Sequence, residues 1–188
     1  MSLDLLSDEA LVERVSSGDS AALEALYERY GSAVAGLGRK ILGERSAIDD
    51  LVQETFWRVW KRAGSFSPGR GRFSSWLFGI AHHQAIDHLR RARSRPHALE
   101  IESEVEAVDP ETDVAEAAGQ SILRSVVQEA FGALPDEQRR VLELAYFRGF
   151  SRREISEALG VPLGTIHTRA RLGLIKLRAE LRTRGYNE

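Results

Sequence analysis

Residues 151–169 read SRREISEALGVPLGTIHTR, a pattern typical of two helices joined by a tight turn. Ser151 is followed three residues later by Glu154, and this capping box predicts the start of a short helix. Gly160 can adopt the left-handed conformation that such a turn requires, and Pro162 rules out one continuous helix. We therefore expect a short helix, a glycine turn and a second, longer helix.

The second helix is expected to be capped by Thr165 and to run over residues 166–182, with its apolar side facing inwards at Ile166, Ala170, Leu174 and Leu177. A short helix, a glycine turn and a basic helix form a helix-turn-helix, whose second helix enters the major groove of duplex DNA. The side chains that can reach base edges or phosphates are Arg152, Thr165, His167, Thr168, Arg169, Arg171 and Lys176. The alternative is a helical hairpin with a solvated basic face.

Apolar residues recur at helical spacing along most of the remaining chain. The spacing predicts helices over residues 3–15, 20–43, 48–62, 74–93, 122–134 and 136–148. A capping box of Ser46 and Asp49 is expected to open the third of these helices. Residues 64–73 contain three glycines and a proline, so they are expected to form a loop. No segment alternates as a strand does, and the sequence predicts an all-α protein.

The 188 residues carry a net charge of −2, which hides an uneven distribution. Residues 98–123 hold eight acids and no base, whereas the segments before and after them carry an excess of Lys and Arg. Two basic units joined by an acidic segment favour a nucleic-acid partner. We expect two helical domains at residues 1–96 and 119–188, joined by a flexible acidic linker over residues 97–118.

Composition excludes several classes of protein. The chain contains no cysteine, which excludes disulfides, thiolate catalysis and zinc held by cysteine. It has no apolar window long enough to cross a bilayer, so we expect no membrane insertion. The first ten residues carry three acids and no Lys or Arg, unlike a secretory signal peptide. A cytoplasmic location is therefore expected.

The N-terminal half contains three further motifs. Residues 49–60 read DDLVQETFWRVW, residues 73–81 read FSSWLFGIA, and residues 87–91 read DHLRR. They resemble region 2 of bacterial sigma factors, and residues 134–142 (LPDEQRRVL) together with the helix-turn-helix are similar to region 4. A chain with only these two regions and a short linker resembles the extracytoplasmic-function (ECF) group. The resemblance covers roughly residues 20–95 and 120–180.

This resemblance implies a function in transcription initiation, without catalysis and without a cofactor. It implies binding to core RNA polymerase, through the coiled coil of the largest subunit, and recognition of the −10 and −35 promoter elements. An anti-sigma factor is the further partner that it implies, and the free protein is expected to be a monomer. The acidic linker would pass through a basic channel of the polymerase, although a merely solvated tether remains an alternative.

The resemblance also assigns roles to residues. On the helix over residues 48–62, one face would dock on the polymerase through Asp49, Asp50, Gln53, Glu54 and Trp57. The loop over residues 65–73 has the flexible backbone, arginines and aromatic rings that capture of single-stranded DNA needs. Phe66 and Phe73 could equally be core anchors. With the outer face of the following helix, the candidate −10 contacts are Phe66, Arg70, Arg72, Phe73, Trp76, His83, Gln84, Asp87, Arg90 and Arg91.

Two other functions are compatible with parts of the sequence. A metal-dependent hydrolase would use His82, His83, Asp87 and His88, but the HExxH order of zinc proteases is absent, and we expect no metal. An ordinary regulator would fuse a helical sensing domain to a DNA-binding domain. The chain also departs from the family at Leu172 and Gly173, where further basic residues are common, and a mid-helix glycine costs about 1 kcal/mol relative to alanine.

Overall fold

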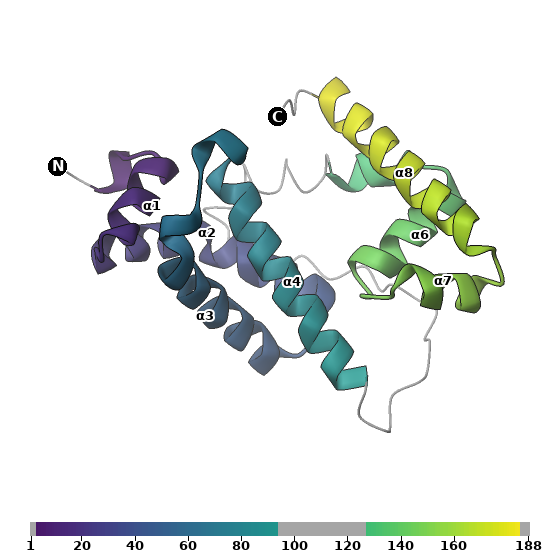
Figure 1. The fold of residues 1–188 in the computed structure, drawn as a ribbon, viewed down its shortest axis with the longest axis horizontal. Helices are drawn as coiled ribbons and strands as arrows, with labels where there is room; N and C mark the ends of the chain where they lie inside the picture. The colour runs from purple at the N-terminus through teal and green to yellow at the C-terminus, as the bar shows by residue number, and fades with distance from the viewer. Residues whose placement is uncertain (1–2, 94–126, 185–188) are drawn as a thin grey trace. The chain divides into compact units, whose positions relative to one another are not determined.

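The computed structural model describes residues 3–93 and 127–184 of the chain (Figure 1). Contacts divide the chain into two compact units, Met1–Glu100 and Ile101–Glu188. Every regular element in the described ranges is a helix, which confirms the all-α prediction. None of the described helices has the length and apolarity needed to cross a membrane. The predicted linker over residues 97–118 lies outside the described residues.

The N-terminal unit consists of long helices joined by short turns. Its elements in chain order are the 3₁₀-helix η1 Leu3–Leu5, α1 Asp8–Ser16, α2 Ser20–Ile41, α3 Arg45–Arg62, η2 Ala63–Ser65, η3 Pro68–Arg70 and α4 Phe73–Arg93. The predicted first helix is divided in two because Ser7 caps α1, its hydroxyl accepting a hydrogen bond from the Ala10 amide. Asp19 caps α2, its side chain accepting hydrogen bonds from the Ala21 and Ala22 amides.

The third helix begins earlier than the sequence predicts. Helix α3 starts at Arg45, and Glu44 before it makes no side-chain capping bond. The Ser46 hydroxyl donates a hydrogen bond to Glu44 Oε1 at 2.7 Å instead of capping a helix, so the predicted capping box with Asp49 is wrong. Ala47 and Ile48 are buried, and their burial in the first turn extends the helix beyond the predicted start.

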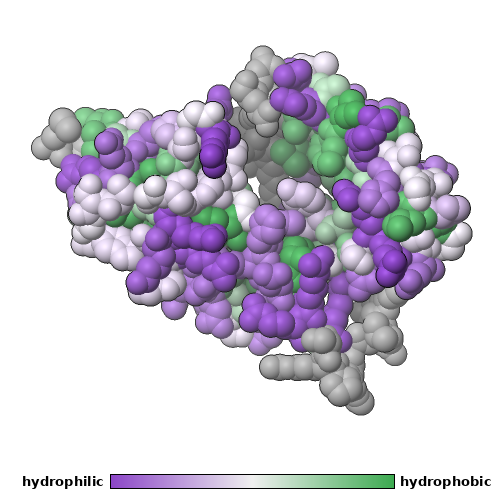
Figure 2. Space-filling model, in the orientation of Figure 1, coloured by the Kyte–Doolittle hydropathy of each residue, from purple (hydrophilic) through white to green (hydrophobic). Residues whose placement is uncertain are grey.

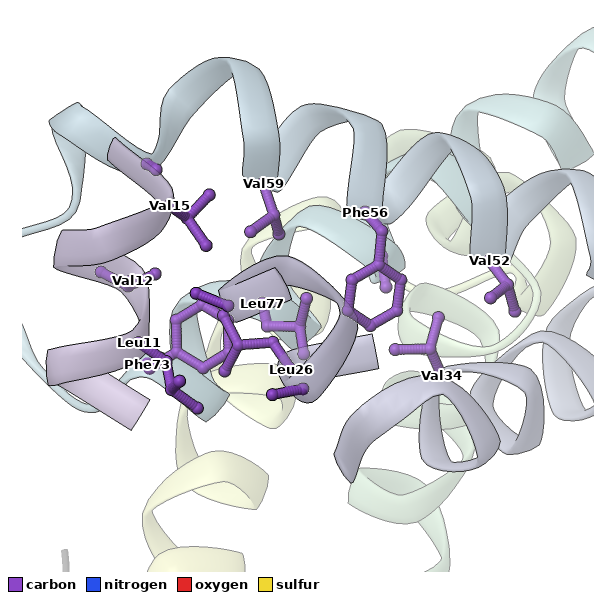
Figure 3. Close-up of a cluster of buried hydrophobic side chains, with 14 residues drawn as sticks. Leu11, Val12, Val15, Leu26, Val34, Val52, Phe56, Val59, Phe73 and Leu77 are labelled. Carbon is purple, nitrogen blue, oxygen red and sulfur yellow. The ribbon is translucent and has the colours of Figure 1, made fainter. Parts of the chain in front are cut away.

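The core of the N-terminal unit lies where its four α-helices meet (Figure 3). Its labelled side chains point toward one another from all four helices: Leu11, Val12, Val15, Leu26, Val34, Val52, Phe56, Val59, Phe73 and Leu77. Full burial of one Leu, Val or Phe side chain is worth about 1.5–3 kcal/mol. A rigid bundle of this kind fixes the directions in which the outer faces of α3 and α4 point.

A polar cluster joins α1 to α2 beside this core. Asp8 accepts a hydrogen bond from Arg29 Nη1 at 2.9 Å and a second one from the Tyr30 hydroxyl. Burial, together with the bond to Asp8, raises the pKa of Tyr30 above its ordinary value, so the hydroxyl keeps its proton at physiological pH.

The C-terminal unit contains the predicted helix-turn-helix. Residues 127–132 are helical, and the elements that follow are α6 Asp136–Tyr146, α7 Arg152–Leu159 and α8 Leu163–Thr183. Ser151 and Glu154 form both hydrogen bonds of the capping box at the start of α7. Gly160 has a φ of +63°, the left-handed conformation that ends α7.

Two details of α8 differ from the sequence predictions. The helix begins at Leu163, because Pro162 supplies the extended residue before it and its carbonyl accepts a hydrogen bond from the Thr165 amide at 2.9 Å. Thr165 therefore lies in the first turn and is not the cap. Leu174 is 49% exposed instead of facing inwards, because buried Gly173 is the residue that packs against Leu142 of α6.

Candidate protein and nucleic-acid interfaces

Helix α3 has a buried side and an exposed side. Leu51, Val52 and Phe56 face the core, whereas the predicted polymerase-binding side chains are all exposed: Asp49, Asp50, Gln53, Glu54 and Trp57. Hydrophilic residues gather over α3 and over the C-terminal half of α4 (Figure 2). The structure thus brings these five side chains together on the solvent-facing side of one rigid helix.

The exposed side of α3, defined by those five residues, is organised around Trp57. The indole is 54% exposed, and the Lys61 ammonium lies 4.6 Å from the centre of its ring, within reach of a cation–π interaction. Arg58 donates a hydrogen bond to Glu54 at 2.9 Å. Asp50 makes no ion pair within the described residues. An exposed tryptophan on the same face as an acid that makes no ion pair is a pattern suited to binding another protein.

The loop before α4 carries exposed arginines next to a cluster of aromatic side chains. Arg70 and Arg72 are exposed, and Phe66 is half-buried, with its ring centre 5.9 Å from Phe73 and 5.5 Å from Trp76. Phe73 could be either a core anchor or a DNA contact from the sequence. It is fully buried in the structure, so it is a core anchor. The prediction that Phe73 contacts DNA directly is therefore wrong. Phe66 and Trp76 are only partly buried, so each has exposed surface that could meet a base.

Helix α4 corrects one predicted contact. His83, Asp87, Arg90 and Arg91 are exposed, as an outer face requires, but Gln84 is only 6% exposed. It shares the inner side of the helix with residues such as Ala81 and Ala85, so its predicted place on the outer face is wrong. Neither polar atom of the Gln84 amide has a hydrogen-bond partner. An unsatisfied buried amide of this kind costs about 1–3 kcal/mol.

The histidines of α4 do not form a recognisable metal site. The rings of His82 and His83 have their centres 6.0 Å apart, and His83 Nδ1 lies 2.6 Å from the Gly79 carbonyl oxygen. Within the described part of the chain, no group of three His, Cys, Asp or Glu side chains is arranged to hold a metal ion. The hydrolase alternative depended on such a group, so the geometry of α4 gives it no support.

Helices α7 and α8 carry the predicted duplex-binding side chains. Most of them are exposed: Arg152, Thr165, His167, Thr168, Arg171 and Lys176. The Thr168 hydroxyl donates to the Gly164 carbonyl at 3.0 Å. Arg169 differs, because its side chain is 23% exposed and its Nη2 lies 2.7 Å from Oε2 of Glu137.

Sequence reasoning missed two residues of these surfaces. Lys61 is four positions after Trp57 on the same helix, so helical spacing could have identified it. Glu137 is distant from Arg169 in the sequence and lies on another helix, so only the packing of α6 against α8 reveals their contact.

Comparison with known proteins identifies both units. Residues 26–95 match the model of Sigma-70 region 2, and residues 124–177 match that of Sigma-70 region 4. The ECF RNA polymerase sigma factor SigK of Mycobacterium tuberculosis (strain H37Rv) is 34% identical over 171 residues, which cover 90% of this chain and 91% of the relative. The SigK of Mycobacterium sp. (strain KMS) is 34% identical over 169 residues, 88% of this chain and 86% of the relative.

Among solved structures, that of Rhodobacter sphaeroides SigE in complex with the anti-sigma ChrR is 30% identical to this chain. The match covers 92% of this chain and 97% of SigE, with a TM-score of 0.46. Two region models in sequence order, and a relative 34% identical over nine-tenths of both chains, assign the family. The chain belongs to the ECF RNA polymerase sigma factors.

Proposed function

We propose that this sigma factor binds core RNA polymerase through the exposed side of α3 and directs it to promoters. The observation that carries the proposal is that the opposite side of α3 is buried in the core, so the exposed side is held in one orientation. Asp49, Asp50, Gln53, Glu54 and Trp57 supply acids, an amide and an aromatic ring to a helical partner surface. The expected partner is the coiled coil of the largest polymerase subunit.

The −10 element is the proposed ligand of the loop before α4 and of the outer face of α4. Arg70 and Arg72 would contact phosphates, and the exposed parts of Phe66 and Trp76 would stack on unpaired bases. Phe73 supports both of these rings from the core and does not touch DNA. The remaining proposed contacts are the exposed side chains of His83, Asp87, Arg90 and Arg91.

The −35 element is the proposed ligand of α8, whose first turns would enter the major groove. The proposed contacts are the exposed side chains of α7 and α8 and the partly buried Arg169. The exposed ones are Arg152, Thr165, His167, Thr168, Arg171 and Lys176. Each phosphate neutralised by one of these cations should make binding more sensitive to salt.

The remaining elements of the proposal rest on membership of the family. The domains are placed at residues 1–96 and 119–188, with residues 97–118 as the linker. The protein is proposed to act in the cytoplasm without catalysis of its own, to be a monomer when free, and to be held inactive by an anti-sigma factor.

Binding to sigma-free core polymerase tests the proposal. We expect the wild-type chain to bind with nanomolar affinity. A paired Asp50→Arg, Gln53→Ala variant should bind at least about tenfold more weakly, because reversing a charge on a docked surface opposes like charges across the interface, and a loss of about 1.4 kcal/mol is tenfold in affinity. The measurement is fluorescence anisotropy of the labelled full chain titrated with core polymerase.

A Glu24→Arg variant is the matched control, because it makes the same change of charge at an exposed position of α2. It should bind as the wild type does. Equal weakening by Glu24→Arg would mean that net charge, and not the exposed side of α3, governs binding. No binding by a folded wild-type chain would contradict the proposal and favour a regulator that binds duplex DNA by itself.

A further inference from the structure

The contact between Arg169 and Glu137 is unlike the surroundings of the other basic residues at the start of α8. It joins the proposed DNA-binding helix to the first turn of α6, and the Nη2–Oε2 distance is 2.7 Å. Arg171 and Lys176 make no ion pair within the described residues and extend from exposed positions. Of the cations placed on the proposed −35 surface, Arg169 is the one that α6 holds in place.

The position of Arg169 on α8 explains why it can reach α6. Ile166, Ala170 and Gly173 form the buried stripe of the helix, and Arg169 lies three residues after the first of them and four before the last. Its side chain is 23% exposed, so most of it is packed against its surroundings, and its guanidinium meets Glu137 of α6.

Glu137 lies on a part of the backbone that packing holds in place. It is the second residue of α6, where the helix dipole favours an acidic side chain. Val141 and Leu142 bury the next turn of that helix in the core of the unit. The Glu137 side chain is 68% exposed, and ion pairs with such exposure add little to stability. The contact therefore adds little to the stability of the fold, and its main physical effect is to orient the Arg169 guanidinium.

We propose that Glu137 is a positioning residue, which holds the Arg169 guanidinium in the orientation that contacts a guanine in the duplex bound by α8. A guanidinium has five N–H donors, so Arg169 can bond to Glu137 through Nη2 and still offer two donors to the O6 and N7 atoms of guanine. Fixing the side chain beforehand lowers the entropy lost on binding. This inference rests on the proposed binding of α8 to the −35 element.

The alternative role of Glu137 is purely electrostatic, because any carboxylate near DNA repels phosphates. Asp136 provides a matched comparison. It is the neighbouring residue, it is exposed, and its carboxylate pairs at 2.5 Å with Arg139 of its own helix instead of with α8. Asp136→Asn and Glu137→Gln remove the same charge from the same turn, but only the second removes the partner of Arg169.

The experiment uses the full chain bound to core polymerase and a duplex library with a randomised upstream segment. Bound duplexes are sequenced for the wild type and for Glu137→Gln, Asp136→Asn and Arg169→Lys. We expect the wild type to select a motif that contains a guanine. Arg169→Lys should reduce that preference by about tenfold, because an ammonium lacks the planar fork of donors that a guanidinium presents. Glu137→Gln should reduce the preference for the same guanine several-fold, whereas Asp136→Asn should leave the motif unchanged.

The double variant Glu137→Gln, Arg169→Lys should be no less selective than Arg169→Lys alone, because the two residues act as one unit. Equal motifs for Glu137→Gln and Asp136→Asn would overturn the inference while leaving the proposed function intact. Retention of every base preference by Arg169→Lys would overturn it as well. If the wild-type complex selects no motif, the proposed binding of the −35 element fails, and the inference fails with it.

Discussion

Gly173 lies in the interior of α8, where glycine normally destabilises a helix by about 1 kcal/mol relative to alanine. The position is buried, and a Cβ there would lie 3.0 Å from Leu142 Cδ1 and 3.3 Å from Gln138 Cβ. Overpacking of this kind costs about 1–3 kcal/mol. We therefore expect Gly173→Ala to lower the free energy of unfolding of the C-terminal unit by up to about 2 kcal/mol, measured by urea denaturation followed by circular dichroism.

Gly164→Ala is the control, because this glycine also lies in α8 but no atom comes within 4 Å of its Cβ position. Alanine there should leave the free energy of unfolding unchanged or raise it by less than about 1 kcal/mol. If both variants were equally stable, close packing would not explain Gly173. The same crowding accounts for the departure from the family pattern at Gly173, since a long basic side chain at this position would collide with α6.

At the scale of elements, Asp19 joins α1 to α2 and makes the junction sensitive to pH. Its carboxylate accepts hydrogen bonds from Arg14 Nε at 2.7 Å and from the amides of Ala21 and Ala22. The hydrogen bond from Arg14 lowers the pKa of Asp19 below its ordinary value of 3.8. Because the folded-state pKa is the lower one, the stabilisation is complete above 3.8 and disappears as pH falls through the folded-state pKa.

We expect Asp19→Asn, which keeps a capping oxygen but has no charge, to lower the melting temperature at neutral pH. The difference from the wild type should shrink as the pH falls below 3.8. Thermal unfolding, monitored by tryptophan emission at several pH values, measures the melting temperatures of the wild type and the variant and how their difference changes with pH. Ser20→Ala, at the neighbouring exposed position, removes no titratable group and serves as the control, so its difference from the wild type should stay constant. A difference for Asp19→Asn that does not change with pH would contradict the role given to Arg14.

The sequence predicts the helices better than it predicts their first residues. Apolar spacing is a property of the whole helix, so it survives small errors, and Ser151 caps its helix as expected. The starts of α3 and α8 differ because they depend on tertiary packing and on the backbone of one residue, Pro162. A Ser or Thr near the start of an apolar pattern is a weak predictor of the N-cap, because a residue can cap a helix only where its own backbone is extended.

The same reasoning explains the differences at the candidate interfaces. The residues of the exposed side of α3 could be predicted because they lie opposite a clear apolar stripe. Gln84 could not, because its polarity indicated the outside while its position on α4 turns it toward the core. Phe73 depends on the path of the preceding loop, and the pairing of Arg169 with Glu137 depends on how two helices pack. Neither of these leaves a local signal in the sequence.

At the scale of the whole molecule, the two units have separate cores. The cluster of the N-terminal unit draws on residues 3–81, the cluster of the C-terminal unit draws on residues 131–177, and they share no residue. The three tryptophans of the chain, Trp57, Trp60 and Trp76, all lie in the N-terminal unit. Tryptophan emission therefore reports on that unit, whereas far-ultraviolet circular dichroism reports on the helices of both.

Separate cores predict separate responses to core substitutions. Ile155 is fully buried in the C-terminal unit, so Ile155→Val should lower the stability of that unit by about 1 kcal/mol and leave the midpoint of the emission change in urea unaltered. Leu26→Ala, in the other core, should shift the emission midpoint by an amount equivalent to about 2–5 kcal/mol. If Ile155→Val moved the emission midpoint as far as it moves the circular dichroism, the units would unfold as one. Region 2 and region 4 could then not be treated as independently stable modules, each presenting its own surface to polymerase and promoter.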